Sequence, residues 1–277
     1  MKYKISFITY IDVLGFKNIV ASSKPQRVHN ILRYMKKGLS GSGELSKIIE
    51  RRILNFSDTI IRSTNVLSKT NKKQRIGLFY NELCDIIYFQ ADMIINGVFL
   101  RGGITIDYLY HKSSIIFGPG LIEAHRLESQ QAIYPRVIID NSVFAVHKQT
   151  NLLSGAMHDF ETDISYISNL ICKDKKGVFF VDYLRAIDTI CPIGTICGEG
   201  NDYIKFIFDH RQQIINAYTK NKGKRKITAK YRWLASYHNW VVSGLNEKFF
   251  LYYGMKKSKA LVPKRISGKY IDQFSII

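Results

Sequence analysis

The chain has 277 residues, of which 46% are hydrophobic, and a formal net charge of +19 at pH 7. This hydrophobic content suffices for a packed core and excludes a disordered chain, and no apolar run reaches the roughly 18 residues that a membrane-spanning helix needs. The N-terminal stretch carries Lys2, Lys4 and Asp12 and lacks a small-residue cleavage site, which is not the pattern of a signal peptide. We therefore expect a soluble, cytoplasmic protein with no membrane insertion, whose surface attracts polyanions.

The cysteines show neither the paired Cys-x-x-Cys spacing of a zinc site nor the density of a disulfide scaffold. We expect all of them to be reduced thiols: Cys84, Cys172, Cys191 and Cys197.

The first half of the chain alternates short strands with helices. Residues 3–11 predict a strand that ends in the turn "DVLGF", and a helix follows from Pro25. Residues 51–58 and 59–64 predict two strands joined by a tight turn at Ser57 and Asp58. Further on we expect a helix, two strands, a helix and a strand, over residues 75–96, 98–111, 112–118, 119–129 and 135–140. This mixed order favours an α+β fold, with a mixed or antiparallel sheet and helices packed on one face.

The second half gives weaker signals: a strand at 176–184 and helices at 201–218 and 228–242. The last helix carries Trp233, Tyr237 and Trp240 near one face, a spacing more typical of a core or a dimer interface than of a stacking platform for bases. The basic block Lys220–Lys226 has two interpretations, a solvated linker or helix face and an anion-binding segment.

Two acids stand in apolar surroundings, Asp12 at the end of the first strand and Asp58 at the hairpin turn. A desolvated carboxylate is costly unless a cation or hydrogen-bond donors offset its charge. If the two strand ends are neighbours, both side chains can reach one divalent ion, and oxygen ligands without His or Cys suit Mg²⁺ or Mn²⁺. Gly15, with Lys17 nearby, makes a turn at which backbone amides can approach phosphate oxygens. The alternative is that each aspartate is an ordinary capping or turn residue.

Four segments carry a resemblance: "FITYIDVLGF", "NFSDTII", "LRGGITIDYLYH" and "IIFGPGLIEAHRLES". In this order and spacing they resemble the class III nucleotidyl cyclase catalytic domain, and more closely the pyrimidine cyclases of bacterial Pycsar antiphage defence. The resemblance implies a palm-like (ferredoxin-like) sheet, a catalytic core at residues 1–145, and a continuation at 146–277 with a strand and a basic helical extension packed on the core. It also implies a homodimer with composite active sites.

The resemblance assigns the site residue by residue. Asp12, Asp58 and the Val13 carbonyl would hold two Mn²⁺ or Mg²⁺ ions, and the turn at Gly15 and Phe16 would admit the triphosphate. The resemblance further implies attack of the ribose 3′-hydroxyl on the α-phosphorus with release of pyrophosphate.

Departures from the purine-cyclase pattern concern the base and the ribose. Leu54 and Ile115 occupy the two base-reading positions, and neither side chain can hydrogen-bond a purine edge. Ile122 replaces the ribose-binding asparagine, whereas Arg126 keeps the position of the transition-state arginine; its alternative is an ion pair with Glu123 one turn earlier. Arg101 could reach the base or a phosphate, or could simply pack at a strand edge.

The resemblance therefore implies a cyclase that makes cyclic UMP or cyclic CMP from UTP or CTP as a second messenger in antiphage defence, with no need for nucleic acid. The sequence does not distinguish UTP from CTP. One alternative is a non-catalytic, basic nucleic-acid-binding protein on a palm-like sheet that uses the Lys220–Lys226 block. The other is a different palm-domain nucleotidyltransferase, which the absence of a GGDEF signature disfavours.

Overall fold

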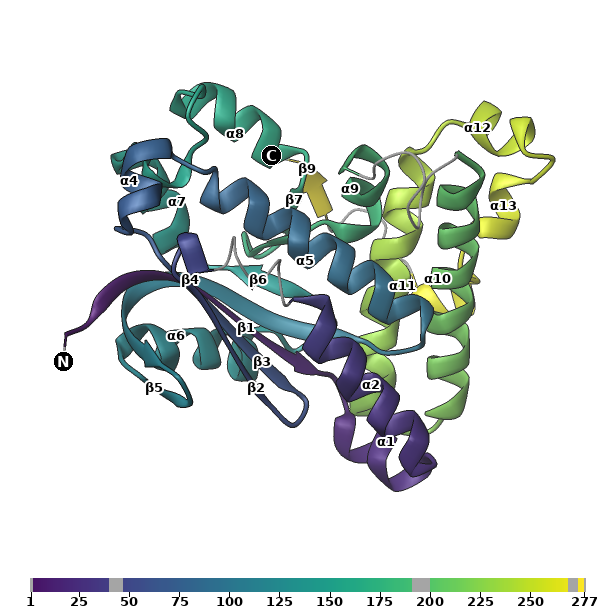
Figure 1. Cartoon of the computed structure of the whole chain (residues 1–277). Helices are drawn as coiled ribbons and strands as arrows, with labels where there is room; N and C mark the ends of the chain where they lie inside the picture. The colour runs from purple at the N-terminus through teal and green to yellow at the C-terminus, as the bar shows by residue number, and fades with distance from the viewer. Residues whose placement is uncertain (1, 40–46, 191–199, 269–273, 277) are drawn as a thin grey trace.

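A mixed sheet forms the framework of the computed structural model, which describes residues 2–39, 47–190, 200–268 and 274–276 (Figure 1). Over these residues the sheet has nine strands in the order β2-β3-β1-β4-β6-β8-β7-β9, with β5 paired to β4 alone. The β4 and β6 strands are parallel, and the other pairs are antiparallel. The bounds are β1 Lys4–Val13, β2 Arg51–Phe56, β3 Thr59–Asn65, β4 Leu100–Lys112, β5 Ile115–Phe117, β6 Val137–Ile139, β7 Ile171–Asp174, β8 Phe179–Val181 and β9 Phe274–Ile276.

Strand β1 lies between β3 and β4, and it buries apolar side chains on both faces of the sheet. Phe7 and Ile11 point into the main core, and Ile8 joins a smaller cluster on the opposite face. A strand rich in β-branched and aromatic residues packs well when it is covered on both sides.

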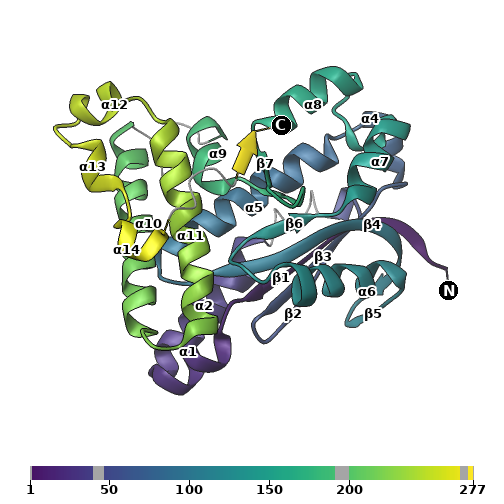
Figure 2. The same ribbon diagram turned by 180° about the vertical axis from the view of Figure 1, so that it is seen from behind.

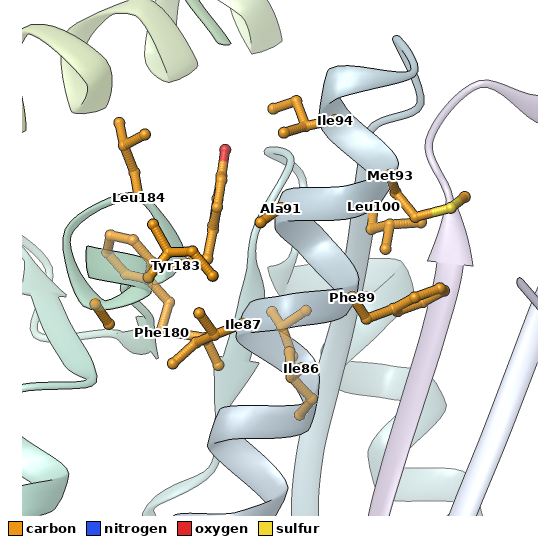
Figure 3. Close-up of a cluster of buried hydrophobic side chains, with 14 of the residues drawn as sticks. Ile86, Ile87, Phe89, Ala91, Met93, Ile94, Leu100, Phe180, Tyr183 and Leu184 are labelled. Atoms are coloured by element: carbon orange, nitrogen blue, oxygen red, sulfur yellow. The ribbon is translucent and has the colours of Figure 1, made fainter. Parts of the chain in front are cut away.

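One long helix, α5 (Leu78–Ile95), covers the main-core face of the sheet. Figure 3 shows its apolar side chains facing those of β8 and of α9 (Tyr183–Ile190), among them Ile87 and Phe180. On the opposite face lies α6 (Pro119–Arg126), which continues into the π-helical turn η1 (Leu127–Gln131), as Figure 2 shows from behind.

The C-terminal part of the described chain is mostly helical. Helices α10 (Gly200–Lys220) and α11 (Arg225–Gly244) pair beside one end of the sheet, with their lower ends next to α1 (Phe16–Ser22) and α2 (Pro25–Gly38) in both views. The remaining short helices are α4 Lys69–Gln74, α7 Asn141–Gln149, η2 Asn151–Leu153, α8 Phe160–Ser168, α12 Glu247–Tyr252, α13 Lys257–Ala260 and α14 Lys264–Ser267.

The α+β class, the mixed and mostly antiparallel sheet and the helical C-terminal extension are confirmed. The sheet runs on past residue 145 through β8, β7 and β9. The core interpretation of the aromatic stripe also holds, since Trp233 and Tyr237 are buried against Phe180 and Phe274. The sequence did not predict α4, whose residues "KTNKKQ" are all polar. Ser68 caps the start of this helix, because its hydroxyl accepts a hydrogen bond from the Asn71 amide.

Two of the cysteines can be placed. Cys84 is half-buried and Cys172 buried, and both are free thiols, whereas Cys191 and Cys197 lie outside the described residues. No helix within the described ranges is both long and apolar enough to cross a bilayer.

Candidate active site at the end of strand β1

The two predicted acids lie together at the end of β1 and the start of β3. Asp12 is paired across the strands with Thr59, the first residue of β3, and Asp58 lies in the preceding turn. The Val13 amide donates to the Asp58 carbonyl at 3.2 Å, which holds the hairpin tip against the end of β1. The antiparallel register therefore makes neighbours of two residues that are 46 positions apart.

Arg101 joins the acids from the other side of β1. It lies opposite Asp12 in the β1–β4 register, and its Nε and Nη2 donate to Asp12 Oδ2 at 3.3 and 3.2 Å. The Thr59 hydroxyl donates to the other carboxylate oxygen of Asp12 at 3.2 Å. Arg101 Nη2 also lies 2.6 Å from Glu128 Oε1, so one guanidinium spans two carboxylates.

Glu128 is a site residue that the sequence interpretation missed. Its side chain is only 4% exposed, and it comes from η1, where the Ala132 amide bonds to the Leu127 carbonyl at 2.8 Å in the i+5 pattern of a π-turn. A signal was present, since Gly120, Ala124, Leu127 and Glu128 have the spacing of one buried helix face.

The close approach of η1 to the sheet depends on a glycine in β4. A Cβ atom on Gly103 would lie 2.5 Å from the Cβ of Leu127 and 2.9 Å from the Ala124 carbonyl oxygen. Only a residue without a side chain lets the helix lie this near the strand, which places Glu128 beside Arg101.

The electrostatics of the cluster disfavour its negative charges. Burial, followed by the nearby charge of Asp58, raises the pKa of Asp12, although Arg101 opposes the shift. Burial likewise raises the pKa of Glu128 to about 7, against the lowering effect of Arg101 and with a further rise from Asp12. Burial also raises the pKa of the neighbouring Tyr10 hydroxyl. Three neighbouring carboxylates, of which Arg101 pairs with two, form a site that an added cation would stabilise.

The donor set fits an oxygen-ligated divalent ion whose coordination is completed by another molecule. No group of three or more His, Cys, Asp or Glu residues in the described part of the chain has the geometry of a closed metal site. Asp12, Asp58 and the Val13 carbonyl offer oxygens, and Arg101 supplies positive charge at Asp12. Glu128 Oε1 is buried and lacks a hydrogen bond of good angle despite its short distance to Arg101. Ions such as Mg²⁺ commonly bind through few carboxylates plus substrate phosphates.

The residues predicted for the triphosphate turn lie directly after β1. Gly15 has φ +77° before α1, a conformation that favours glycine, and Phe16 is half-buried. Lys17, expected near the phosphates, is exposed on α1.

The predicted base-reading residues are not together in one chain. Leu54 packs at the edge of the small cluster beneath α6, whereas Ile115 is 57% exposed. Ile115 pairs with Lys112 at the opposite end of β4 from Arg101, about 36 Å along the strand at ~3.3 Å per residue.

Arg126 does not contact the acids. Its Nε and Nη2 donate to the Glu123 carboxylate at 2.7 and 2.6 Å, as the alternative interpretation expected. Ile122, on the same helix, is 72% exposed.

Neither a protein-family model nor a curated protein matches the chain. Among solved structures, a bacterial light-regulated adenylyl cyclase is similar at 11% identity and TM-score 0.43, covering 68% of this chain and 94% of that one. The monomeric guanylyl cyclase domain of the RhoGC fusion protein from the aquatic fungus Blastocladiella emersonii is similar at 12% identity and TM-score 0.40, covering 65% and 96%. A class III adenylyl cyclase-like ATP-binding protein from Pseudomonas aeruginosa follows at 8% identity and TM-score 0.34, covering 86% and 69%. The acid cluster, not these distant similarities, supports the proposal that follows.

Proposed function

We propose that this chain is a nucleotide cyclase that converts UTP or CTP into the 3′,5′-cyclic monophosphate and pyrophosphate. The observation that carries the proposal is the convergence of Asp12 and Asp58 at the end of β1, where burial and mutual charge raise the pKa of Asp12. Carboxylates kept in such a place are typical of a functional cation site.

Each site residue has a proposed task. Asp12, Asp58 and the Val13 carbonyl hold two Mn²⁺ or Mg²⁺ ions. When bound, these ions supply positive charge to the triphosphate and favour ionisation of the ribose 3′-hydroxyl. Arg101 orients Asp12 and Glu128 through its ion pairs. Arg126 stays a prediction for the transition state, and its ion pair with Glu123 would have to open first.

The preference for a pyrimidine rests on the apolar character of Leu54 and Ile115, which offer no hydrogen bond to a purine edge. Ile115 is too far along β4 to reach the acids of its own chain, which supports a composite site formed by two copies in a homodimer. The role as a second-messenger enzyme of antiphage defence is proposed from the sequence resemblance alone.

The test is incubation of the full chain with Mn²⁺ and each of the four ribonucleoside triphosphates, followed by product mass. We expect a cyclic pyrimidine monophosphate, and Asp12→Asn or Asp58→Asn should reduce its formation about 100-fold or more because each removes a metal-binding charge. Asp107→Asn is the matched control, since Asp107 lies further along β4, opposite Ser6, away from the cluster.

Three results would contradict the proposal: no turnover of any triphosphate, a dinucleotide or polymer as product, or full activity in Asp12→Asn. Tight, salt-dependent binding of nucleic acid that survives Asp12→Asn, without turnover, would instead support the nucleic-acid-binding alternative.

A further inference from the structure

A cavity of about 380 Å³ opens next to the acid cluster and is lined by residues of α1, α2, α10 and α11. This volume lies within the range of small-molecule sites. It starts at Leu14 and Gly15, directly after β1, where the Leu14 amide bonds to the Phe99 carbonyl at 2.8 Å. Its polar lining includes Gly15, Arg27, Gln213, Asn216, Lys220 and Lys230.

The lining is cationic. Arg27, Lys220 and Lys230 contribute positive charge, and no aspartate or glutamate is found among the described residues that line the cavity. Side-chain amides, including those of Gln213 and Asn216, add hydrogen-bond donors. Such a set suits an anion with several acceptor oxygens.

Two of these cations, Lys220 and Lys230, come from the C-terminal helices α10 and α11. Lys220 ends α10, and its Nζ donates to the Ser22 hydroxyl at the end of α1 at 3.1 Å. Gln213 donates to the Ile95 carbonyl at 3.0 Å, which ties α10 to the end of α5. Lys230 comes from the α11 face that also carries Ile227 and Tyr231, at the i+3 and i+4 spacing of one helix surface.

Lys230 links the cavity to the acids. Burial lowers the pKa of this half-buried lysine. The charge of Arg101 lowers it further and the charge of Glu128 raises it, and both residues belong to the acid cluster. The ion pairs of the described residues do not include Lys230. A half-buried cation without a paired carboxylate is stabilised by a bound anion.

We propose that this cavity binds the polyphosphate tail of the nucleotide, and that Lys220 and Lys230 are phosphate-binding residues supplied by the C-terminal helices of the same chain. The inference rests on the proposed function, since it names residues that take one part of that substrate. It also gives the start of the Lys220–Lys226 block a role within the active site, in place of a purely solvated one.

The first test is calorimetric titration of the full chain with inorganic tripolyphosphate in EDTA, so that neither metal nor base contributes. We expect binding that weakens at high salt, and a loss of about tenfold or more in affinity in Lys230→Ala and in Lys220→Ala, because each removes a charged hydrogen-bond donor. Lys226→Ala is the control, because Lys226 is exposed one turn before Lys230 and does not line the cavity. This variant should bind tripolyphosphate as tightly as the unmodified chain. Circular dichroism checks that each variant folds.

The second test is the Michaelis constant for the triphosphate that the enzyme turns over, which should rise about tenfold in Lys230→Ala and stay unchanged in Lys226→Ala. Turnover with an unchanged Michaelis constant in both cavity variants, or tripolyphosphate binding indifferent to Lys220 and Lys230, would overturn this inference and leave the cyclase proposal standing. Binding that depends on these lysines without turnover of any triphosphate would support the polyphosphate site and refute the cyclase.

Discussion

Replacing Glu128 by glutamine should stabilise the metal-free protein at pH 8 and change its stability little at pH 5. The carboxylate is buried beside Asp12 and Arg101, and its raised pKa means that these surroundings disfavour its ionised form even with Arg101 present. Glutamine has nearly the same size and shape but never carries that charge.

The magnitude follows from the shift of the Glu128 pKa from 4.5 to about 7. Between these values the native chain keeps a proton that the unfolded chain has lost, so the free energy of unfolding falls as the pH rises through this window. At ~1.36 kcal/mol per pH unit the full shift corresponds to about 3 kcal/mol. Water and ions that reach the open side of the site reduce this figure, and we expect about 1.5 to 3 kcal/mol in favour of Glu128→Gln at pH 8.

The assay is urea unfolding of both proteins in EDTA at pH 5, 6, 7 and 8. Glu123→Gln is the control, because Glu123 lies one turn earlier with its side chain 30% exposed and pairs with Arg126 instead of the cluster. The electrostatic reasoning is refuted if the difference between Glu128→Gln and the unmodified chain is the same at pH 5 and pH 8, or if the variant is less stable at pH 8.

Added Mn²⁺ extends the same experiment to the metal site. A divalent ion at Asp12 and Asp58 would compensate the negative charge of the cluster, so saturating Mn²⁺ should narrow the pH 8 difference in unfolding free energy. A difference that Mn²⁺ leaves untouched would contradict cation binding beside Glu128.

Three further predictions concern the framework of the site. Glu82→Ala should lower the free energy of unfolding in urea by about 3 kcal/mol, because the buried Arg62, which is 1% exposed, would keep only its ion pair with Asp85. A loss under ~1 kcal/mol would show that the Arg62–Glu82 ion pair does little to stabilise β3. His238 is fully buried, and burial lowers its pKa from 6.5 to about 4, so the free energy of unfolding should fall as the pH drops below about 6.5. His238→Gln should remove about 2 kcal/mol of the loss in unfolding free energy between pH 7.5 and 5. If this loss is the same in the variant, His238 is not its source. Gly103→Val should move η1 away from β4, because the valine side chain would overlap Leu127 and Ala124. In this background Glu128→Gln should no longer raise the free energy of unfolding at pH 8. If the double variant still shows that gain, the close contact of η1 with β4 is not what buries Glu128.

Much of the fold around the acids could be predicted because its signals are local. The apolar run of β1, the two-residue turn at Ser57 and Asp58, and the helical spacing of α5 each depend on residues close together in the chain. Helix α4 was missed because its six residues are all polar, and its start depends on a cap at Ser68 rather than on an apolar face.

The site could be predicted only in part. Asp12 and Asp58 stand out in the sequence, since a carboxylate in an apolar strand end is unusual. Glu128 does not, because glutamate is common in helices and its burial depends on how closely η1 lies against Gly103. The partner of Arg126 was open between two interpretations, and side-chain packing on α6 favours Glu123.

The sequence by itself determined most of the strands and helices around the acids, and where two carboxylates interrupt apolar surroundings. The tertiary structure alone decided that Arg101 spans Asp12 and Glu128, and that Lys220 and Lys230 border the turn at Gly15 more than 200 positions away in the chain. The physical reason is that strand register and helix docking are set by the packing of the whole core, and no local pattern of residues specifies which distant side chains that packing brings together.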